Sequence, residues 1–484
     1  MNSDNHDKEA LKQLVIDAIS KQCISAAESA DEDTPADIRK LASALNNGHK
    51  LQLSILSGGL ANYSYKVTCT DETKDVVLFA KLTFTYALVF PDKPCPLDRT
   101  KYEFESLNIY KDVVSKSPKA SNEAVTPYFC IDVEGDHKLL VAQFSKLDEQ
   151  AANQFIDGVT DLRVSSKLAN SLAALHSTKG FDPNHNIDIK PFIQDLVNIL
   201  EEIFDGMIKE EDNGDIDRPT KLGKSMGKSM LDKIISTYRE KLDDRDCIVH
   251  GDCHVFNMLV ELKPSIEKLE NFGEKGDIVL IDWEFSRCGP LAIDMGFIHP
   301  FPITCVLTHA MNGELSSSEN ILKFLDTLWD EYSSTVETDR ELSDIYRTML
   351  SFTGVILIAY YKLGFHLEFL PIDKGNVEGL NRIKKSIGVL GMKFLSWGFG
   401  EEDTTTLPEI RKRFKDTVAE EMQLLSPVKK MRGRNRRSSM LRASGRRVSD
   451  AHLMLGNGSV RDMTTLMEAE ATLPLFTADE EDPL

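Results

Sequence analysis

The chain has 484 residues, of which 41% are hydrophobic and 28% are charged, so its composition is that of a globular protein and excludes collagen, coiled-coil and wholly disordered classes. Its formal net charge of −20, from 57 basic and 77 acidic residues, argues against nucleic-acid partners or anionic membranes. Eight scattered cysteines without a C-x-x-C pair, and the lack of a signal, transit or membrane-spanning pattern, predict a cytoplasmic protein with no membrane partner.

The first 50 residues predict one peripheral helix and a linker. Leu11, Leu14, Val15 and Ile19 recur at helical spacing, and an acidic run of small residues, AAESADEDTPAD, follows them. We therefore assign residues 1–50 to an N-terminal helix and linker.

Residues 51–147 change to short β-type runs and predict a small sheet with one helix. Between the third and fourth runs, Arg99–Val113 has a helical pattern. The β-type runs are Leu51–Leu56, Tyr63–Thr68, Val76–Leu82, Tyr128–Val133 and Leu139–Phe144.

Helical patterns dominate from residue 148 to about 405. They begin with a Leu-rich helix at Leu162–His176. Residues 205–228 are charged and poorly periodic, which predicts a surface insertion. Three strand-like runs interrupt the helices: Cys247–His250, Met258–Glu261 and Ile278–Ile281.

Residues 406–484 predict a helix followed by a disordered tail. Ser426–Ser449 holds nine Lys or Arg residues and no acid, and the segment after it is net acidic. Ser439 and Ser449 each follow an arginine pair, a pattern favoured by basophilic protein kinases. A solvated tail without a regulatory role explains the same composition equally well.

Two patterns suggest other chemistry but lack its structural context. Gly223–Gly227 matches the G-x-S-x-G nucleophile elbow of serine hydrolases, yet nothing strand-like precedes it. His250 and His254 flank Asp252 and could ligate zinc, but they follow a strand pattern, whereas paired zinc-binding histidines four residues apart lie on a helix. We set both interpretations aside.

Two later segments deliver acidic and amide groups from apolar strands into loops. Asp252 and Asn257 are five residues apart, the spacing at which a catalytic loop presents a base to a hydroxyl and an amide oxygen to a metal. Asp282 follows four apolar residues, and Glu284 lies two positions further on. Phosphoryl transfer needs such a set, because the hydroxyl must lose a proton while Mg²⁺ neutralises phosphate charge. These groups predict ATP and Mg²⁺ as cofactors.

The first half of the chain holds groups that complement these loops. Gly58 and Gly59 lie in a turn between two strand patterns, where backbone N–H groups could cover phosphates. Lys81 follows an apolar run, where its ammonium could pair with phosphates and with a carboxylate of the next helix. Glu103 and Glu105 are the candidates for that carboxylate, and we favour Glu103.

The segments HGDCHVFN at 250–257 and LIDWEF at 280–285, with RCGPLAIDMG behind them, resemble the aminoglycoside phosphotransferase, choline kinase and methylthioribose kinase superfamily. The order of the Gly-rich turn, Lys81 and a hinge-like LLVAQFS also agrees, and the resemblance covers about residues 50–400. It implies an α+β, bilobal protein-kinase-like fold. The small β-rich lobe would be residues 51–147 and the larger, mainly helical lobe residues 148–405.

The resemblance also implies a role for each matching residue. Asp252 would be the general base and contact the substrate, and His250 would support its loop. The predicted metal ligands are Asn257, Asp282 and Glu284. The residues predicted to bind the nucleotide are Lys81, Glu103, Gly58, Gly59, Asn62, Gln143, Phe144 and Ser145.

The acceptor is predicted to be a small molecule with a hydroxyl group. The D-x-E form of the second motif resembles S-methyl-5-thioribose kinase, which favours a methylthioribose-like sugar. Members of that family usually carry an Arg pair that meets the sugar; here only Arg382 can take that role, and Asn257 stands where a small hydroxyl residue is expected.

Other functions stay open. Choline or ethanolamine kinase is the first alternative, and it would need aromatic residues around a quaternary ammonium. The aromatic candidates lie at helical spacings that favour a core role: Trp329, Tyr332, Tyr360, Tyr361 and Trp397. A catalytically inactive kinase-fold binding protein is the second alternative. A homodimer is one open oligomeric state.

Overall fold

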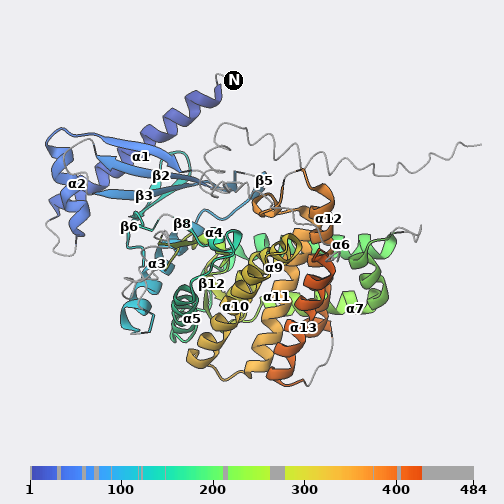
Figure 1. Ribbon diagram of the computed structural model, residues 1–484. Coiled ribbons are helices and arrows are strands. Elements are labelled where there is room, and N and C mark those ends of the chain that lie inside the picture. The colour runs from blue at the N-terminus through green and yellow to red at the C-terminus, as the bar shows by residue number, and fades with distance from the viewer. Residues whose placement is uncertain are drawn as a thin grey trace, which may run out of the picture. The chain divides into compact units, whose positions relative to one another are not determined.

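The computed structural model describes residues 3–29, 34–56, 62–69, 76–88, 90–117, 119–120, 124–147, 149–210, 216–261, 278–373, 375–400 and 405–427. They form a mixed α+β protein, with a sheet in the N-terminal part and a mainly helical remainder, which confirms the predicted fold class (Figure 1). Gly58, Gly59, Ser439 and Ser449 lie outside the described residues, as does the predicted disordered tail.

The chain divides into two compact units. The first contains the described residues within 1–97 and 132–139, and the second contains those within 98–131 and 140–427. The division passes through the strands β6 (Pro127–Val133) and β7 (His137–Gln143).

The first unit is built on an antiparallel meander. β2 (Tyr63–Cys69) pairs with β1 (Leu51–Leu56) on one side and with β3 (Val77–Thr83) on the other, and the full sheet order is β1-β2-β3-β7-β6. Apolar residues alternate along β2 toward the buried face, as a half-buried strand requires. A separate pair of strands, β4 (Tyr86–Ala87) and β5 (Phe90–Pro94), follows.

Two helices precede this sheet. The helix predicted from the first leucines is α1 (Ser3–Glu28), which packs on β1. The region predicted as a linker contains a second helix, α2 (Ala36–Asn46), which packs against α1. Ile38, Leu41 and Ala42 bury one face of α2, because three- and four-residue spacings place side chains on the same side of a helix.

The second unit is mainly helical. α11 packs against α12, α10 packs against α5 and α9, and α6 packs against α7 (Figure 1). Its helices are α3 (Arg99–Lys116), α4 (Ala152–Ile156), α5 (Leu162–His176), α6 (Lys190–Lys209), α7 (Arg218–Leu242), α8 (Ile293–Ile298), α9 (Pro300–Asn312), α10 (Leu315–Thr335), α11 (Leu342–Leu363), α12 (Val377–Leu395) and α13 (Leu407–Leu425). Its short strands are β8 (Glu149–Gln150), β9 (Cys247–Val249), β10 (Met258–Val260), β11 (Ile278–Leu280) and β12 (Arg287–Gly289).

Residues 205–228, predicted to be a surface insertion without helical periodicity, are helical at both ends. α6 continues to Lys209, and α7 already begins at Arg218. The Asp217 side chain accepts a hydrogen bond from the Thr220 N–H, and a proline occupies the first turn, which are two signals of a helix start. The G-x-S-x-G sequence therefore lies within α7, so it forms no nucleophile elbow.

Among the described helices, α11 alone has the length and apolar composition of a membrane span, and 61% of its most apolar window is buried inside the protein. That burial is the environment of a core helix.

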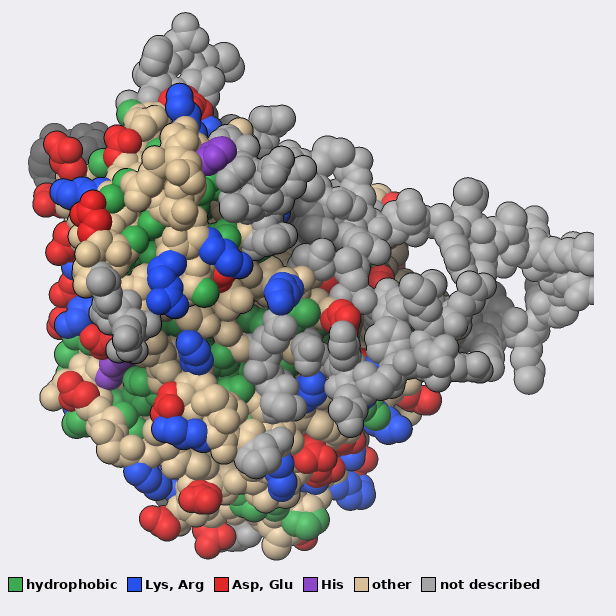
Figure 2. Space-filling model, turned by 90° about the vertical axis from the view of Figure 1, so that its left-hand side faces the viewer, with side chains coloured by type: hydrophobic (Ala, Val, Ile, Leu, Met, Phe, Trp, Pro, Cys, Tyr) green, Lys and Arg blue, Asp and Glu red, His purple; other side chains and the backbone are tan. Residues whose placement is uncertain are grey.

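On the face drawn in Figure 2, acidic and basic side chains of the described residues are interspersed.

Candidate active site

Two strand pairings hold the predicted catalytic loops side by side. β9 and β10 bracket the first loop, β11 and β12 bracket the second, and β9 pairs with β12 while β10 pairs with β11. The Ile281 N–H donates to the Asn257 carbonyl at 3.0 Å. The loop of Asp252 and Asn257 is therefore joined by backbone hydrogen bonds to the residue preceding Asp282.

The first loop turns sharply at Gly251. Its φ of +82° is in the left-handed region that glycine adopts without a steric cost. A Cβ at this position would lie 2.3 Å from the Phe285 carbonyl oxygen, so the two loops approach too closely for any side chain here.

Within the first loop, Asn257 holds Asp252. Its Nδ2 donates to the Asp252 carboxylate at 3.2 Å and to the Asp252 carbonyl at 3.0 Å. These bonds use the amide nitrogen, so the amide oxygen is the atom of Asn257 suited to a cation.

His254 is a second partner of Asp252. Its Nε2 lies 3.5 Å from the Asp252 Oδ2, and the two side chains are 25% and 30% exposed. Burial alone would raise the pKa of the Asp252 carboxyl, but the charge and hydrogen bond of His254, with smaller contributions from His250 and Asn257, lower that pKa to about 2. The charge and hydrogen bond of Asp252 raise the pKa of His254, although burial acts in the opposite direction. Asp252 is thus ionised at neutral pH and can accept a hydrogen bond from a hydroxyl.

His250 supports the first loop through two hydrogen bonds. It is fully buried, its Nε2 donates to the Ile281 carbonyl at 3.0 Å, and its Nδ1 accepts from the Asp252 N–H at 3.3 Å. Burial lowers the pKa of His250, which favours the neutral ring that these two bonds require. The geometry agrees with the supporting role predicted for His250.

A buried carboxylate fixes the backbone of the same loop. Asp294 accepts the N–H groups of His250 and Gly251 at 2.7 and 2.9 Å, and the Nε2 of His176 lies 3.0 Å from its Oδ2. The Nδ1 of His176 is in turn 2.8 Å from the Tyr332 hydroxyl. These polar groups are fully buried, so their hydrogen bonds give the loop one preferred position.

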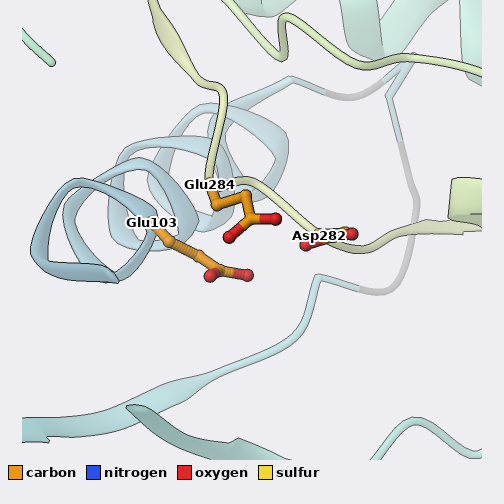
Figure 3. A group of neighbouring side chains, drawn as sticks. All are labelled: Glu103, Asp282 and Glu284. Carbon is orange, nitrogen blue, oxygen red and sulfur yellow. The ribbon is translucent and has the colours of Figure 1, made fainter. Parts of the chain in front are cut away.

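The second loop contributes two members of a carboxylate group. Glu103, Asp282 and Glu284 each offer an oxygen within 4.8 Å of the others (Figure 3). Glu103 projects from α3, whereas Asp282 and Glu284 come from the loop after β11. Asp282 has φ +65°, a left-handed conformation uncommon for a non-glycine residue and frequent at functional positions. Carboxylate oxygens are the ligands that Mg²⁺ and Ca²⁺ prefer, so this group is suited to a divalent cation.

Sequence reasoning missed Arg99. Its Nε donates to Glu284 Oε2 at 3.1 Å, and the side chains are 0% and 3% exposed. The available signal was its spacing: Arg99 and Glu103 are four residues apart in a predicted helix and so share one face.

The residues predicted to bind nucleotide are placed as follows. Lys81 and Asn62 belong to the first unit and are each 4% exposed. Gln143 ends β7, and the Ser145 hydroxyl accepts from the Leu147 N–H at 3.0 Å, with Phe144 partly exposed between them. Their roles stay predictions.

Arg382 makes its hydrogen bonds elsewhere. Its Nη2 donates to the carbonyls of Leu424 and Leu425 at 2.9 and 3.2 Å, at the end of α13. An arginine in this place satisfies carbonyls that a helix end leaves unpaired. The predicted contact between Arg382 and substrate therefore gains no support from these bonds.

The family comparison matches the segment that contains this site. Residues 164–308, which include both catalytic loops and Asp294, match the model of the ecdysteroid kinase-like family. Over these residues the chain is similar to that family, and the family's description as kinase-like agrees with the predicted class of enzyme. No curated protein sequence matches the chain.

The comparison with solved structures finds kinases and phosphotransferases at low sequence identity. An aminoglycoside phosphotransferase from Alicyclobacillus acidocaldarius is 15% identical, with a TM-score of 0.39, and the match covers 75% of this chain and 92% of that one. The amicoumacin kinase hAmiN, solved with AMP-PNP, Ca²⁺ and its antibiotic, is 14% identical, with a TM-score of 0.38 and coverages of 70% and 88%. A choline kinase from Cryptosporidium parvum is 13% identical, with a TM-score of 0.32 and coverages of 78% and 90%.

Proposed function

We propose that this protein transfers the γ-phosphoryl group of Mg-ATP to a hydroxyl of a small molecule, with Asp252 as the base. The observation that carries the proposal is the joined pair of loops. Asn257 bonds to Asp252 through its side chain and to Ile281 through its carbonyl, which fixes the base relative to Asp282. Phosphoryl transfer depends mainly on such positioning.

The low pKa of Asp252 fits this chemistry. An ionised carboxylate can orient the acceptor hydroxyl by accepting its hydrogen bond, and it takes the proton as the new P–O bond forms. Asn257 and His254 prevent Asp252 from turning away, because both bond to its carboxylate.

A divalent cation would be held by the acidic loop. Asp282 is the central candidate, because it belongs to the carboxylate group and follows directly after the bond to Asn257. The Asn257 amide oxygen, Glu284 and Glu103 are the further candidates. When bound, Mg²⁺ supplies charge neutralisation at the phosphate oxygens.

The nucleotide contacts are proposed from the sequence. Lys81 would anchor phosphates, with the backbone of Gly58 and Gly59 covering them, and Gln143–Ser145 would meet the adenine. The low exposure of Lys81 supports a specific role, because a buried ammonium needs a charged or polar partner.

The first acceptor candidate is a methylthioribose-like sugar. Its support is the D-x-E motif, whose two acids lie together in the carboxylate group. The aromatic side chains considered for the alternative, a choline or ethanolamine pocket, are buried, and Tyr332 bonds to His176, which agrees with a core role.

An apolar, ring-bearing alcohol is a second acceptor candidate. Phe256 of the loop stacks on His366 with centroids 4.4 Å apart, and the rings of His254 and Phe369 lie 5.9 and 6.1 Å from the same imidazole. His254 connects this ring cluster to Asp252. The matched family is described as ecdysteroid kinase-like, so a hydroxylated steroid is a suitable test compound.

A product assay tests these proposals. Purified protein is incubated with Mg-ATP and methylthioribose, choline, ethanolamine, an aminoglycoside or an ecdysteroid, and products are scored by a mass increase of one phosphoryl group. Phosphorylation of one acceptor by wild type but not by Asp252→Asn is the expected result. No product with any compound, although the protein binds ATP, would favour the inactive binding protein.

A further inference from the structure

Helix α3 presents a cation and an anion on one buried face. Arg99 and Glu103 are four residues apart and are 0% and 2% exposed. Residues at this spacing lie one above the other on a helix, so both face the same neighbour. That neighbour is the second catalytic loop.

Two reciprocal interactions join α3 to the loop. The Arg99 guanidinium donates to Glu284 Oε2 at 3.1 Å, and the Trp283 N–H donates to Glu103 Oε1 at 3.2 Å. The helix therefore gives a positive group to the loop and accepts a hydrogen bond from the adjacent residue. Two such contacts, one helical turn apart, fix both the position and the rotation of α3 relative to the loop.

Packing contacts also join α3 to the second loop. α3 lies within residues 98–131, which group with the helical unit. Trp283 is fully buried, and its ring packs on Tyr110 of α3 with centroids 4.7 Å apart. α3 and residues 282–284 thus form one packed element.

The buried carboxylates of this element need positive charge nearby. Three carboxylates within 4.8 Å repel one another, and burial strengthens the repulsion because water screens it less. Arg99 supplies one positive charge inside the group.

We propose that Arg99 is a positioning residue for the cation centre: it holds Glu284, ties α3 to the loop and supplies a fixed positive charge beside the carboxylates. This inference rests on the proposed function only in assigning a cation to Asp282. The pairing of Arg99 with Glu284 makes Glu284 chiefly a link to α3, while Asp282 serves as the main cation ligand.

The test measures thermal stability with and without Mn²⁺ for wild type, Arg99→Met, Arg99→Lys, Glu284→Gln and the Arg99→Met/Glu284→Gln double variant. Arg99→Met removes the guanidinium that pairs with the buried Glu284 carboxylate, so its Tm without Mn²⁺ should fall by about 5 °C or more. Arg99→Lys should lose less, because it keeps the charge. The double variant should melt above Arg99→Met, since it also removes the buried negative charge of Glu284.

The Mn²⁺ response separates a charge role from simple packing. Mn²⁺ should raise the Tm of Arg99→Met more than that of wild type, because the ion can replace the lost guanidinium charge. Lys101→Met is the matched control: Lys101 lies on the same helix, is 58% exposed and should change neither value.

Three outcomes would overturn the inference: an unchanged Tm for Arg99→Met, a double variant that melts no higher than Arg99→Met, or equal Mn²⁺ shifts in wild type and Arg99→Met. These measurements need no turnover. A wild type that phosphorylates no acceptor would contradict the proposed function. It would not affect the Arg99 inference, which the stability measurements test separately.

Discussion

The side-chain amide of Asn257 contacts Asp252 twice, at the carboxylate and at the backbone carbonyl. One residue thereby restrains both the side chain of Asp252, the proposed base, and the backbone of its loop. Because these bonds use only the nitrogen, the amide oxygen can serve a cation on the other side. In the proposed mechanism, the five-residue spacing between Asp252 and Asn257 would thus couple the base and the cation through one side chain.

Replacing Asn257 by Ala should lower kcat by about 10²-fold or more, because the base loses its restraint and the cation loses an oxygen ligand. Steady-state kinetics on the phosphorylated acceptor would measure this. A circular dichroism spectrum like that of wild type would establish that the fold is kept. A variant within threefold of wild-type kcat would contradict the coupling described above.

Asp282→Asn should weaken divalent-cation binding by about 10-fold or more, since a neutral amide replaces the central carboxylate of the group. Calorimetric titration with Mn²⁺ would report it. Asp232→Asn, at an exposed position of α7, is the control and should bind as wild type does. Equal affinities in all three proteins would place the cation elsewhere.

Gly251→Ala should be destabilised and inactive for two reasons. The new Cβ would clash with the Phe285 carbonyl, and the alanine would have to adopt a positive φ. The backbone conformation alone costs about 1–2 kcal/mol. Gly180→Ala provides the comparison: Gly180 has φ +79°, but a Cβ added there would have no atom within 4 Å, so this variant carries only the backbone cost. Urea unfolding should show a larger loss for Gly251→Ala, and similar losses would refute the close contact between the loops.

Asp294 should make stability depend on pH in the acid range. Burial alone would raise the pKa of this carboxyl, but the hydrogen bond and charge of His176, with contributions from His250, hold that pKa below its ordinary value. A carboxyl with a lowered folded-state pKa adds stability above its unfolded pKa of about 3.9, and that stability is lost as pH falls through the folded pKa.

Asp294→Asn should therefore cost about 3–5 kcal/mol at pH 7, and the difference from wild type should shrink as pH falls below about 4. Urea unfolding at a series of pH values measures this difference. A gap between the two proteins that stays constant down to pH 3 would show that the Asp294 carboxylate is not the stabilising species.

The fold class and the two catalytic loops could be predicted because local sequence determines them. Apolar runs ending in Asp252 and Asp282 mark strands that deliver acids into loops, and β9 and β11 lie there. Helix α7 was missed because its charged sequence has a weak apolar face, although Asp217 and Pro219 mark its start.

The Arg99–Glu284 pair joins residues 185 positions apart, so no local pattern could indicate it. The same holds for the bond between His176 and Asp294, which spans 118 positions. Arg382 illustrates the opposite case: a residue assigned by resemblance makes its hydrogen bonds to carbonyls of α13, a long-range contact that its own segment does not reveal.

The measurement that tests the central claim most directly is turnover of Asp252→Asn on the acceptor that wild type phosphorylates, at saturating Mg-ATP. The account predicts a fall in kcat of about 10²- to 10⁴-fold with an unchanged affinity for Mn²⁺, because the base is lost while the carboxylates of the cation centre are kept. A variant that retains kcat within threefold of wild type would show that Asp252 is not the base.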